Sequence, residues 1–217
     1  MLGTQDLVQF IIAGILLNIA PGPDSILIMT RSATQGWRAG SAAALGIGAG
    51  TLVHIMAAAL GLSALLATSA MAFTVVKLAG AAYLLYIGAS MLFSKAKSAE
   101  QTQADTEAKA SLPVLSHRKI FMQGFLTNIL NPKVAIFFLA FVPQFIAADA
   151  SNKPLALIVL GCIFNFNGML WCHFLAISTA FARQRMRVNQ AVTLWLNRFI
   201  GLMFVSFGIK LALSGKH

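Results

Sequence analysis

Two charged residues, Asp24 and Lys133, lie in the middle of long apolar segments, and each directly follows a proline. If these segments cross a membrane, each ionised side chain costs about 2.5 to 3.5 kcal/mol on insertion scales, so intramembrane charges usually mark a function and a partner. The two charges could neutralise each other as a structural ion pair. Alternatively, each could hold one end of a zwitterionic ligand. The residue types leave both interpretations open.

Both charges belong to segments that are expected to break. The first segment contains Asn-Ile-Ala-Pro-Gly-Pro-Asp at 18–24, and the second contains Asn-Ile-Leu-Asn-Pro-Lys at 128–133. Each proline removes a backbone donor and clashes with the preceding turn, and glycine adds backbone freedom. Inside a membrane the freed backbone groups must be buried in protein or line a cavity. The breaks therefore supply most of the candidate substrate- or ion-binding residues: Asn18, Pro21, Gly22, Pro23, Asp24, Asn128, Asn131, Pro132 and Lys133.

Two kinds of polar group at the breaks could meet a ligand. The asparagine amides can repair the broken helices by bonding to backbone groups, or they can contact a substrate. The half-helix that starts after Pro23 presents the positive end of its dipole, which suits a carboxylate. We therefore expect an anionic group on the substrate.

A third candidate, His54, follows Gly46 and Gly50 at intervals of four residues. Small residues at this spacing allow helices to approach closely, so the glycines are interpreted as packing residues. His54 could be a proton relay or a ligand, or it could form a hydrogen bond between helices. In a later segment, Asn165 shares a stripe with Gly168, which directs it toward a neighbouring helix.

Composition assigns the chain to the multi-pass membrane proteins. It is 58% hydrophobic and 10% charged, with a mean hydropathy of +0.79, whereas soluble domains carry roughly 25% charged residues. The net charge of +10 does not indicate nucleic acid, because the basic residues lie between apolar segments. Cys162 and Cys172 form neither a disulfide framework nor a CxxC pair and are interpreted as packing residues. No cofactor is indicated.

Hydropathy and charge together predict a topology. Six apolar windows predict membrane-spanning helices near residues 6–30, 38–66, 71–93, 119–147, 154–181 and 191–213. The connections on one side of the predicted bundle carry most of the Lys and Arg residues. By the positive-inside rule that side is cytoplasmic, which places both termini outside.

The order of the segments predicts two halves. Residues 1–93 form a first three-helix repeat, 94–118 a polar, flexible cytoplasmic linker, and 119–217 a second repeat. Lys-x-x-Gly at 77–80 matches Arg-x-x-Gly at 198–201, and the two proline breaks also correspond. Because three helices is an odd number, the second half must insert upside down. The expected fold is an all-α integral membrane protein with six transmembrane helices in two inverted repeats, of which helices 1 and 4 are broken, as in transporters with a site at the midplane.

Several stretches together resemble the LysE/RhtB amino-acid exporter family over essentially the whole chain. They are the first break at 18–24, Gly-Ala-Gly-Thr-Leu-Val-His at 48–54, Lys-Leu-Ala-Gly-Ala-Ala-Tyr-Leu-Leu-Tyr-Ile-Gly at 77–88, the second break at 128–133, and Phe-Val-Pro-Gln-Phe at 141–145. The resemblance implies a secondary active exporter of the bacterial inner membrane, not an enzyme, driven by proton exchange. Its substrates would be amino acids or close derivatives. The Pro-Gly-Pro-Asp form is closer to the RhtB branch and favours neutral substrates such as threonine, homoserine, homoserine lactone or leucine.

Two other functions have weaker support in the sequence. Metal-cation export would need clustered His, Cys and carboxylate ligands, but the spans offer only Asp24, His54, Cys162, Cys172 and His173, without HxxxD or CxxC spacing, so no metal site is predicted. A membrane serine protease would rest on short Gly-x-Ser strings, which are common in glycine-rich helices. The lipid-facing surface of a small six-helix unit is compatible with a homodimer.

Overall fold

The computed structural model describes residues 3–62, 70–93, 113–147, 149–182 and 190–213. Within these ranges the regular secondary structure is helical, and one isolated β-bridge joins Thr4 and Ile146. The elements are α1 (Leu7–Ile19), α2 (Pro23–Gln35), α3 (Trp37–Ala57), the π-helical turn η1 (Ala58–Leu62), α5 (Ala70–Leu92), α7 (His117–Ile129), α8 (Pro132–Ile136), η2 (Phe137–Phe141), η3 (Val142–Phe145), α9 (Lys153–Ala182) and α10 (Gln190–Leu213). Most of the expected linker, up to residue 112, lies outside the described residues.

The expectation of a membrane protein with several apolar helices is confirmed. Three helices, at Trp37–Gly61, Thr74–Leu92 and Lys153–Ala182, are long and apolar enough to cross a membrane. Two bent pairs, Leu7–Ile19 with Pro23–Gln35 and His117–Ile129 with Pro132–Phe145, raise the number of candidate spans to five. The sixth expected span corresponds to α10, which is not among the candidates found in the described residues. Six spans in an inverted repeat therefore remain a prediction.

Both expected breaks are present, and both arise from proline. The chain bends by 52° between α1 and α2, and by 48° between α7 and the segment that begins at Pro132. In the first break, Gly22 is fully extended, with φ −167° and ψ −178°, and Pro23 opens α2 at its first position. In the second, Asn131 caps α8 and Pro132 takes the corresponding first position. Proline is well suited to that position, where its missing N–H has no intrahelical acceptor.

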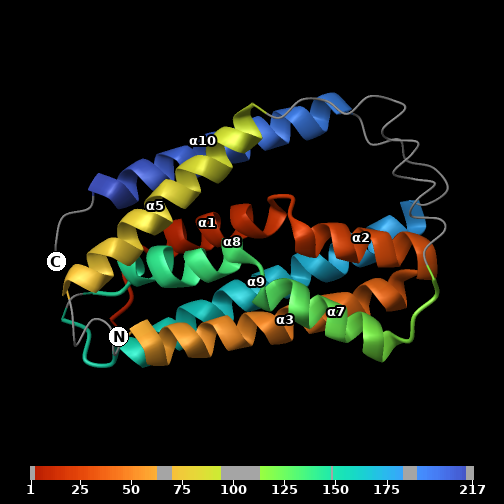
Figure 1. Cartoon of the computed structure of the whole chain (residues 1–217), viewed down its shortest axis with the longest axis horizontal. Helices are drawn as coiled ribbons and strands as arrows, with labels where there is room; N and C mark the ends of the chain where they lie inside the picture. Colours follow the sequence, from red (N-terminus) through yellow and green to blue (C-terminus); the bar gives the residue numbers. More distant parts are fainter. Residues whose placement is uncertain (1–2, 63–69, 94–112, 148, 183–189, 214–217) are drawn as a thin grey trace.

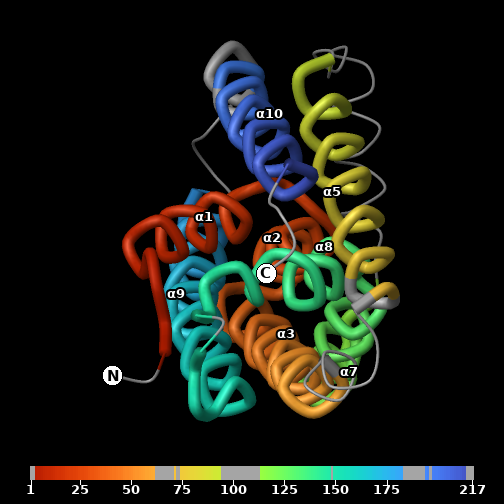
Figure 2. The backbone as a smooth tube through the Cα atoms, turned by 90° about the vertical axis from the view of Figure 1, so that its left-hand side faces the viewer, coloured from red at the N-terminus to blue at the C-terminus, as the bar shows by residue number. Residues whose placement is uncertain are grey.

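The helices form a bundle with a separate pair beside it (Figures 1 and 2). Helices α2, α3, α7 and α9 pack together, and α1 lies against α9. Helices α5 and α10 pack mainly on each other and meet the bundle through η2, as Figure 2 shows from the side. Close approach within the bundle depends on glycine: a Cβ at Gly124 of α7 would collide with the Ala43 carbonyl of α3. Gly46 and Gly50 of α3 do pack helices, as their spacing predicts, because a Cβ at these positions would collide with Phe121 and Asn128 of α7.

A cluster of buried aromatic side chains packs around η2, the helical turn that follows the second break. Phe10 of α1, Phe137 and Phe138 of η2, and Phe164 of α9 are buried, and the ring centroids of Phe137 and Phe164 lie 4.7 Å apart. Aromatic pairs at such separations add about 0.5 to 1.5 kcal/mol each beyond their area burial. The cluster fixes η2 against α1 and α9, so the two breaks are held next to each other.

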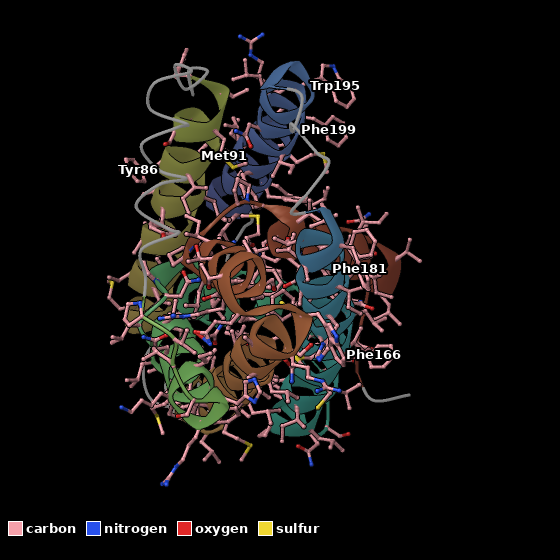
Figure 3. All side chains as sticks on the ribbon, turned by 90° about the vertical axis from the view of Figure 1, so that its right-hand side faces the viewer. Tyr86, Met91, Phe166, Phe181, Trp195 and Phe199 are labelled. Carbon is pink, nitrogen blue, oxygen red and sulfur yellow. The ribbon has the colours of Figure 1, made fainter. Side chains whose placement is uncertain are left out.

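Large apolar side chains cover the outside of the molecule. Tyr86, Phe166, Phe181 and Trp195 are all more than half exposed and point away from the helices in Figure 3. Soluble monomers rarely expose contiguous apolar patches of more than a few hundred Å². The outer surface is instead suited to contact with lipid.

Candidate functional site

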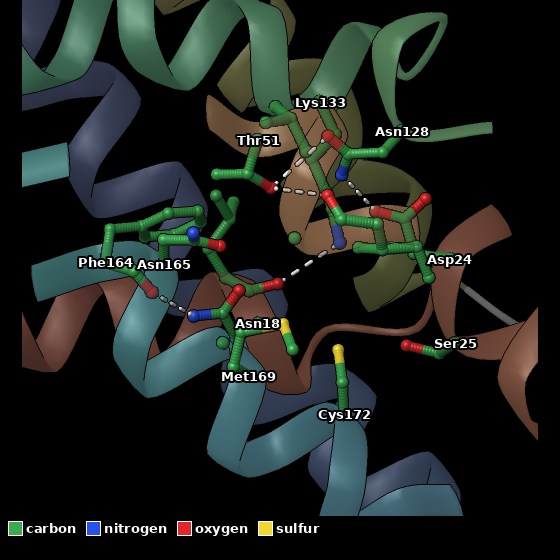
Figure 4. Close-up of a pocket in the computed structure, with 15 residues that line it drawn as sticks. Asn18, Asp24, Ser25, Thr51, Asn128, Lys133, Phe164, Asn165, Met169 and Cys172 are labelled. Carbon is green, nitrogen blue, oxygen red and sulfur yellow. Dashed lines mark hydrogen bonds between the residues drawn. The ribbon is translucent and has the colours of Figure 1, made fainter. Parts of the chain in front are cut away.

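A small pocket lies where the two breaks meet (Figure 4). Four of the predicted site residues line it: Asn18, Asp24, Asn128 and Lys133. The cavity measures about 30 Å³, which is room for about one or two water molecules. Pockets that bury small-molecule ligands usually measure roughly 300 Å³ or more. The pocket is therefore too small for an amino acid in this conformation, and the surrounding side chains or helices must move before one can bind.

The carboxylate of Asp24 is held by two asparagines from the second half of the chain. Its Oδ2 accepts hydrogen bonds from Asn128 Nδ2 at 2.9 Å and from Asn131 Nδ2 at 3.1 Å. Its Oδ1 is buried and has no partner in the described part of the chain. Asp24 also lies in the first turn of α2, where the helix dipole favours a negative charge. Asp24 thus carries one satisfied oxygen and one unused acceptor.

The ammonium of Lys133 is held by the backbone of the first break. Its Nζ donates to the carbonyl oxygens of Leu17 at 3.1 Å and Ala20 at 3.0 Å. In an unbroken helix the Leu17 carbonyl would accept from residue 21, but Pro21 has no N–H. A positive charge at this C-terminal end of α1 also matches the helix dipole. Since an ammonium has three N–H donors, one of them remains available.

The two charged residues therefore reach across the pocket in opposite directions. Each is the second residue of a half-helix that begins with proline, and each binds groups at the other break. No hydrogen bond or ion pair connects Asp24 directly to Lys133 among the residues that the structure describes. Gly22 makes the crossing of Lys133 feasible, because a Cβ at this position would lie 3.2 Å from Lys133 Nζ. The geometry keeps a carboxylate and an ammonium in one pocket without joining them.

The three asparagines bond to protein groups, and their contact with a substrate stays a prediction. Asn131 caps α8 by accepting from Lys133 N at 3.1 Å, and its amide also orients Asp24. Asn128 orients Asp24 and accepts from Thr51 Oγ1 at 3.3 Å. Asn18 lies apart from this network: its Nδ2 donates to the Phe164 carbonyl at 3.5 Å, which ties α1 to α9. The prolines act by breaking the helices.

His54 supports the site without lining the pocket. Its Nε2 lies 3.0 Å from the carbonyl oxygen of Asn128, which also accepts from the backbone N–H of Asn131 at 2.9 Å, since Pro132 cannot supply the usual helical donor. A carbonyl can only accept, so Nε2 must carry the proton. The imidazole also stacks on Phe138, with ring centroids 6.4 Å apart. This geometry favours the helix-to-helix hydrogen bond among the roles considered for His54.

Several pocket residues were not singled out as site residues by the sequence. Ser25 of α2, Thr51 of α3 and Met169 of α9 line the cavity, together with Asn165 and Cys172. The stripe of Asn165 and Gly168 was a usable signal, since it does face other helices. Thr51 had a weaker signal, as an isolated hydroxyl in a glycine-rich segment. Cys172 was interpreted only as a packing residue.

The described residues contain no group of three or more His, Cys, Asp or Glu side chains that could hold a metal ion. Asp24 and Cys172 share the pocket but lack a third ligand of this kind. Metal-cation export thus has no supporting observation.

Comparison with known proteins identifies a family that matches most of this chain. The family model described as "LysE type translocator" matches residues 15–215. An uncharacterized membrane protein of Bacillus subtilis is 35% identical over 97% of this chain and 100% of its own length, and one of Pseudomonas aeruginosa is 31% identical over 97% and 96%. A protein of Salmonella typhimurium named "Leucine efflux protein" is 27% identical over 94% of this chain and 92% of its own. No solved structure matches the chain.

Proposed function

The chain belongs to the LysE type translocator family, and on this premise we propose that it is a secondary active transporter that exports neutral amino acids or close derivatives in exchange for protons. Threonine, homoserine, homoserine lactone and leucine are the candidate substrates. The similarity to proteins named for leucine efflux supports an amino acid as the cargo. The bacterial relatives support a place in the inner membrane, where six spans in two inverted repeats would leave both termini outside.

The observation that carries this proposal is the separation of Asp24 from Lys133. A free amino acid carries an ammonium and a carboxylate on the same carbon. Asp24 Oδ1 is an unused acceptor for the ammonium, and the third N–H of Lys133 is an unused donor for the carboxylate. The start of α2 adds a positive dipole end for the carboxylate. Asp24 and Lys133 together can therefore bind both charged ends of a zwitterionic amino acid.

The charge balance of the pocket favours substrates without a charged side chain. Asp24 and Lys133 are its only Asp, Glu, Lys or Arg side chains among the described lining residues. A third charge on the substrate would have no partner in a low-dielectric site, which costs several kcal/mol. Lysine and arginine are therefore poor candidates.

The same geometry supports an exchange of the substrate for a proton. When the substrate ammonium leaves, Asp24 Oδ1 loses its positive partner, and a charged carboxylate with one oxygen unpaired is costly inside the membrane. Uptake of a proton would neutralise Asp24 and permit the return of the empty carrier. The pocket would widen and narrow during alternating access, in which the two halves rock about the breaks.

Transport into or out of loaded membrane vesicles tests the proposal. We expect the protein to export at least one neutral amino acid, and we expect Asp24→Asn and Lys133→Gln each to reduce this export at least about tenfold, because each removes one charge-assisted contact. Lys153→Gln, at the start of α9 and away from the pocket, is the matched control and should export normally. Unchanged export of every candidate amino acid by both pocket variants would refute the site.

Oligomeric state is a separate part of the proposal. The exposed apolar surface is suited to lipid and leaves room for a homodimer. Crosslinking in native membranes would detect the dimer, and monomers only, at all crosslinker concentrations, would argue against it.

A further inference from the structure

One face of α9 forms the side of the pocket that lies across from the charged pair. Asn165, Met169 and Cys172 line the cavity at intervals of four and three residues, which places them on one face of the helix. In Figure 4, Asn165 and Asp24 lie on opposite sides of the pocket. If Asp24 and Lys133 hold the two charged ends of an amino acid, its side chain must extend away from them, and α9 is the wall that faces it.

The amide of Asn165 has no hydrogen-bond partner in the described chain. The other three asparagines near the breaks differ: Asn18, Asn128 and Asn131 each bond to protein groups. The Asn165 side chain is half-buried, and inside a membrane an amide without a partner costs several kcal/mol. The pocket therefore presents an amide whose donors and acceptor are left for water or a ligand.

Met169 lies one turn further along the same face and restricts the space. Its thioether fills the room left by Gly48 of α3, where a Cβ would lie 2.5 Å from Met169 Sδ. Methionine is unbranched and flexible, so its side chain can move when a ligand enters. Asn165 and Met169 thus give the α9 wall one polar contact and one adjustable apolar contact.

We propose that this α9 face is the side-chain subsite of the transporter, with Asn165 as a specificity-determining residue and Met169 as a limit on side-chain size. Asn165 hydrogen-bonds to an uncharged hydroxyl or carbonyl group on the substrate side chain, and it disfavours a substrate of equal size that lacks this group. This inference rests on the proposed function, since it takes Asp24 and Lys133 as the sites for the charged ends.

Threonine and valine provide a direct test, because they have nearly the same shape and differ by a hydroxyl in place of a methyl group. Purified protein in proteoliposomes is supplied with both amino acids, and the ratio of their transport rates is measured. We expect the wild-type protein to favour threonine about tenfold, because valine would leave the amide unpaired. In Asn165→Leu the ratio should fall to about one or below, with valine transport retained.

Two further variants control this test. Asn167 lies on the same helix but does not line the pocket, so Asn167→Leu should keep the wild-type ratio. Met169→Ala should raise leucine transport relative to valine several-fold, because it removes the side chain that limits the space. If Asn165→Leu does not assemble, Asn165→Ala is used, and the shift in unfolding temperature caused by threonine or valine replaces the transport ratio.

Failure of the α9 subsite and failure of the proposed function would give different results. Export of amino acids with an unchanged threonine-to-valine ratio in the Asn165 variants would overturn the α9 assignment and leave the proposed function standing. The same holds if the wild-type protein does not prefer threonine. A wild-type protein that transports no amino acid would overturn the proposed function itself, and the subsite with it.

Discussion

At the residue scale, the site depends on two side chains that are each bound by the opposite break. Asp24 receives amide donors from Asn128 and Asn131, while Lys133 donates to the carbonyls of Leu17 and Ala20. Hydrogen bonds to charged groups contribute about 1.5 to 3 kcal/mol each, so these contacts hold both charges firmly. The two residues are therefore neither isolated nor engaged with each other, which leaves each with bonding capacity for a ligand.

Gly22 tests the position of the Lys133 ammonium. Gly22→Ala would place a methyl group 3.2 Å from the present position of Lys133 Nζ, so we expect the ammonium to shift and transport to fall about tenfold, with little loss of folded protein. Gly61→Ala is the matched control, since a Cβ there meets no atom within 4 Å. Transport in proteoliposomes gives the readout, and equal rates in the two variants would argue against a precise placement of Lys133.

Exchange of the two charges separates the ligand site from a structural ion pair. In an ion pair, Asp24→Lys combined with Lys133→Asp would restore the interaction and rescue the single variants. The present contacts predict no rescue, because the exchanged lysine would face amide donors and the exchanged aspartate would face backbone carbonyls. Recovery of transport by the double variant would contradict this geometry.

At the element scale, a side chain from another helix binds a backbone carbonyl at each break. The carbonyls of Leu17 and Asn128 each lie four residues before a proline and so lack their helical donor. Lys133 Nζ binds the first carbonyl, and His54 Nε2 contacts the second. The broken helices are thereby stabilised by tertiary contacts, as required inside a membrane.

The role of His54 can be tested through stability. Replacement by leucine removes the interhelical hydrogen bond to the Asn128 carbonyl and leaves only the bond from the Asn131 N–H, so we expect His54→Leu to lower the free energy of unfolding by about 1 kcal/mol. His54→Gln keeps a donor near the position of Nε2 and should lose less. Thermal unfolding in detergent measures both. A His54→Leu protein with normal stability whose transport no longer depends on a proton gradient would instead indicate a proton relay.

Some of these features follow from the sequence, and others do not. The breaks were predictable because the effect of Pro21, Pro23 and Pro132 on a helix is local. The partners of Asp24 and Lys133 were not, because they depend on how two segments more than a hundred residues apart approach each other. The asparagine contacts to Asp24 are of this kind. Asn165 was placed on the correct helix face, yet only the structure shows that it lines the pocket without a partner.

At the scale of the whole molecule, the helices run between two ends. The N-terminal end of α1 and the C-terminal end of α10 lie at the same end in Figure 1, whereas α2 and α9 finish, and α7 begins, at the other. Among the described residues, this second end carries Arg38 at the start of α3 and Arg118 and Lys119 in the first turn of α7. This arrangement supports six crossings, although the described helices give three to five candidate spans.

The side of the membrane on which each end of the chain lies distinguishes six spans from five. Six crossings place them on the same side and five place them on opposite sides. In a background without Cys162 and Cys172, we expect Gln5→Cys and Leu213→Cys to react with an impermeant maleimide on intact cells. Val114→Cys, which precedes α7, should react only after permeabilisation. Reaction of residues 5 and 213 from opposite sides would rule out six spans.

Ligand binding to the pocket variants tests the central claim, that Asp24 and Lys133 hold opposite ends of one amino acid. The affinities of purified protein for an exported amino acid, its N-acetyl derivative and its amide are measured by calorimetry. We expect the wild-type protein to bind the parent amino acid at least about tenfold more tightly than either derivative. Asp24→Asn should abolish only the discrimination against the N-acetyl derivative, and Lys133→Gln only the discrimination against the amide. Variants that both keep the full wild-type discrimination would contradict the account.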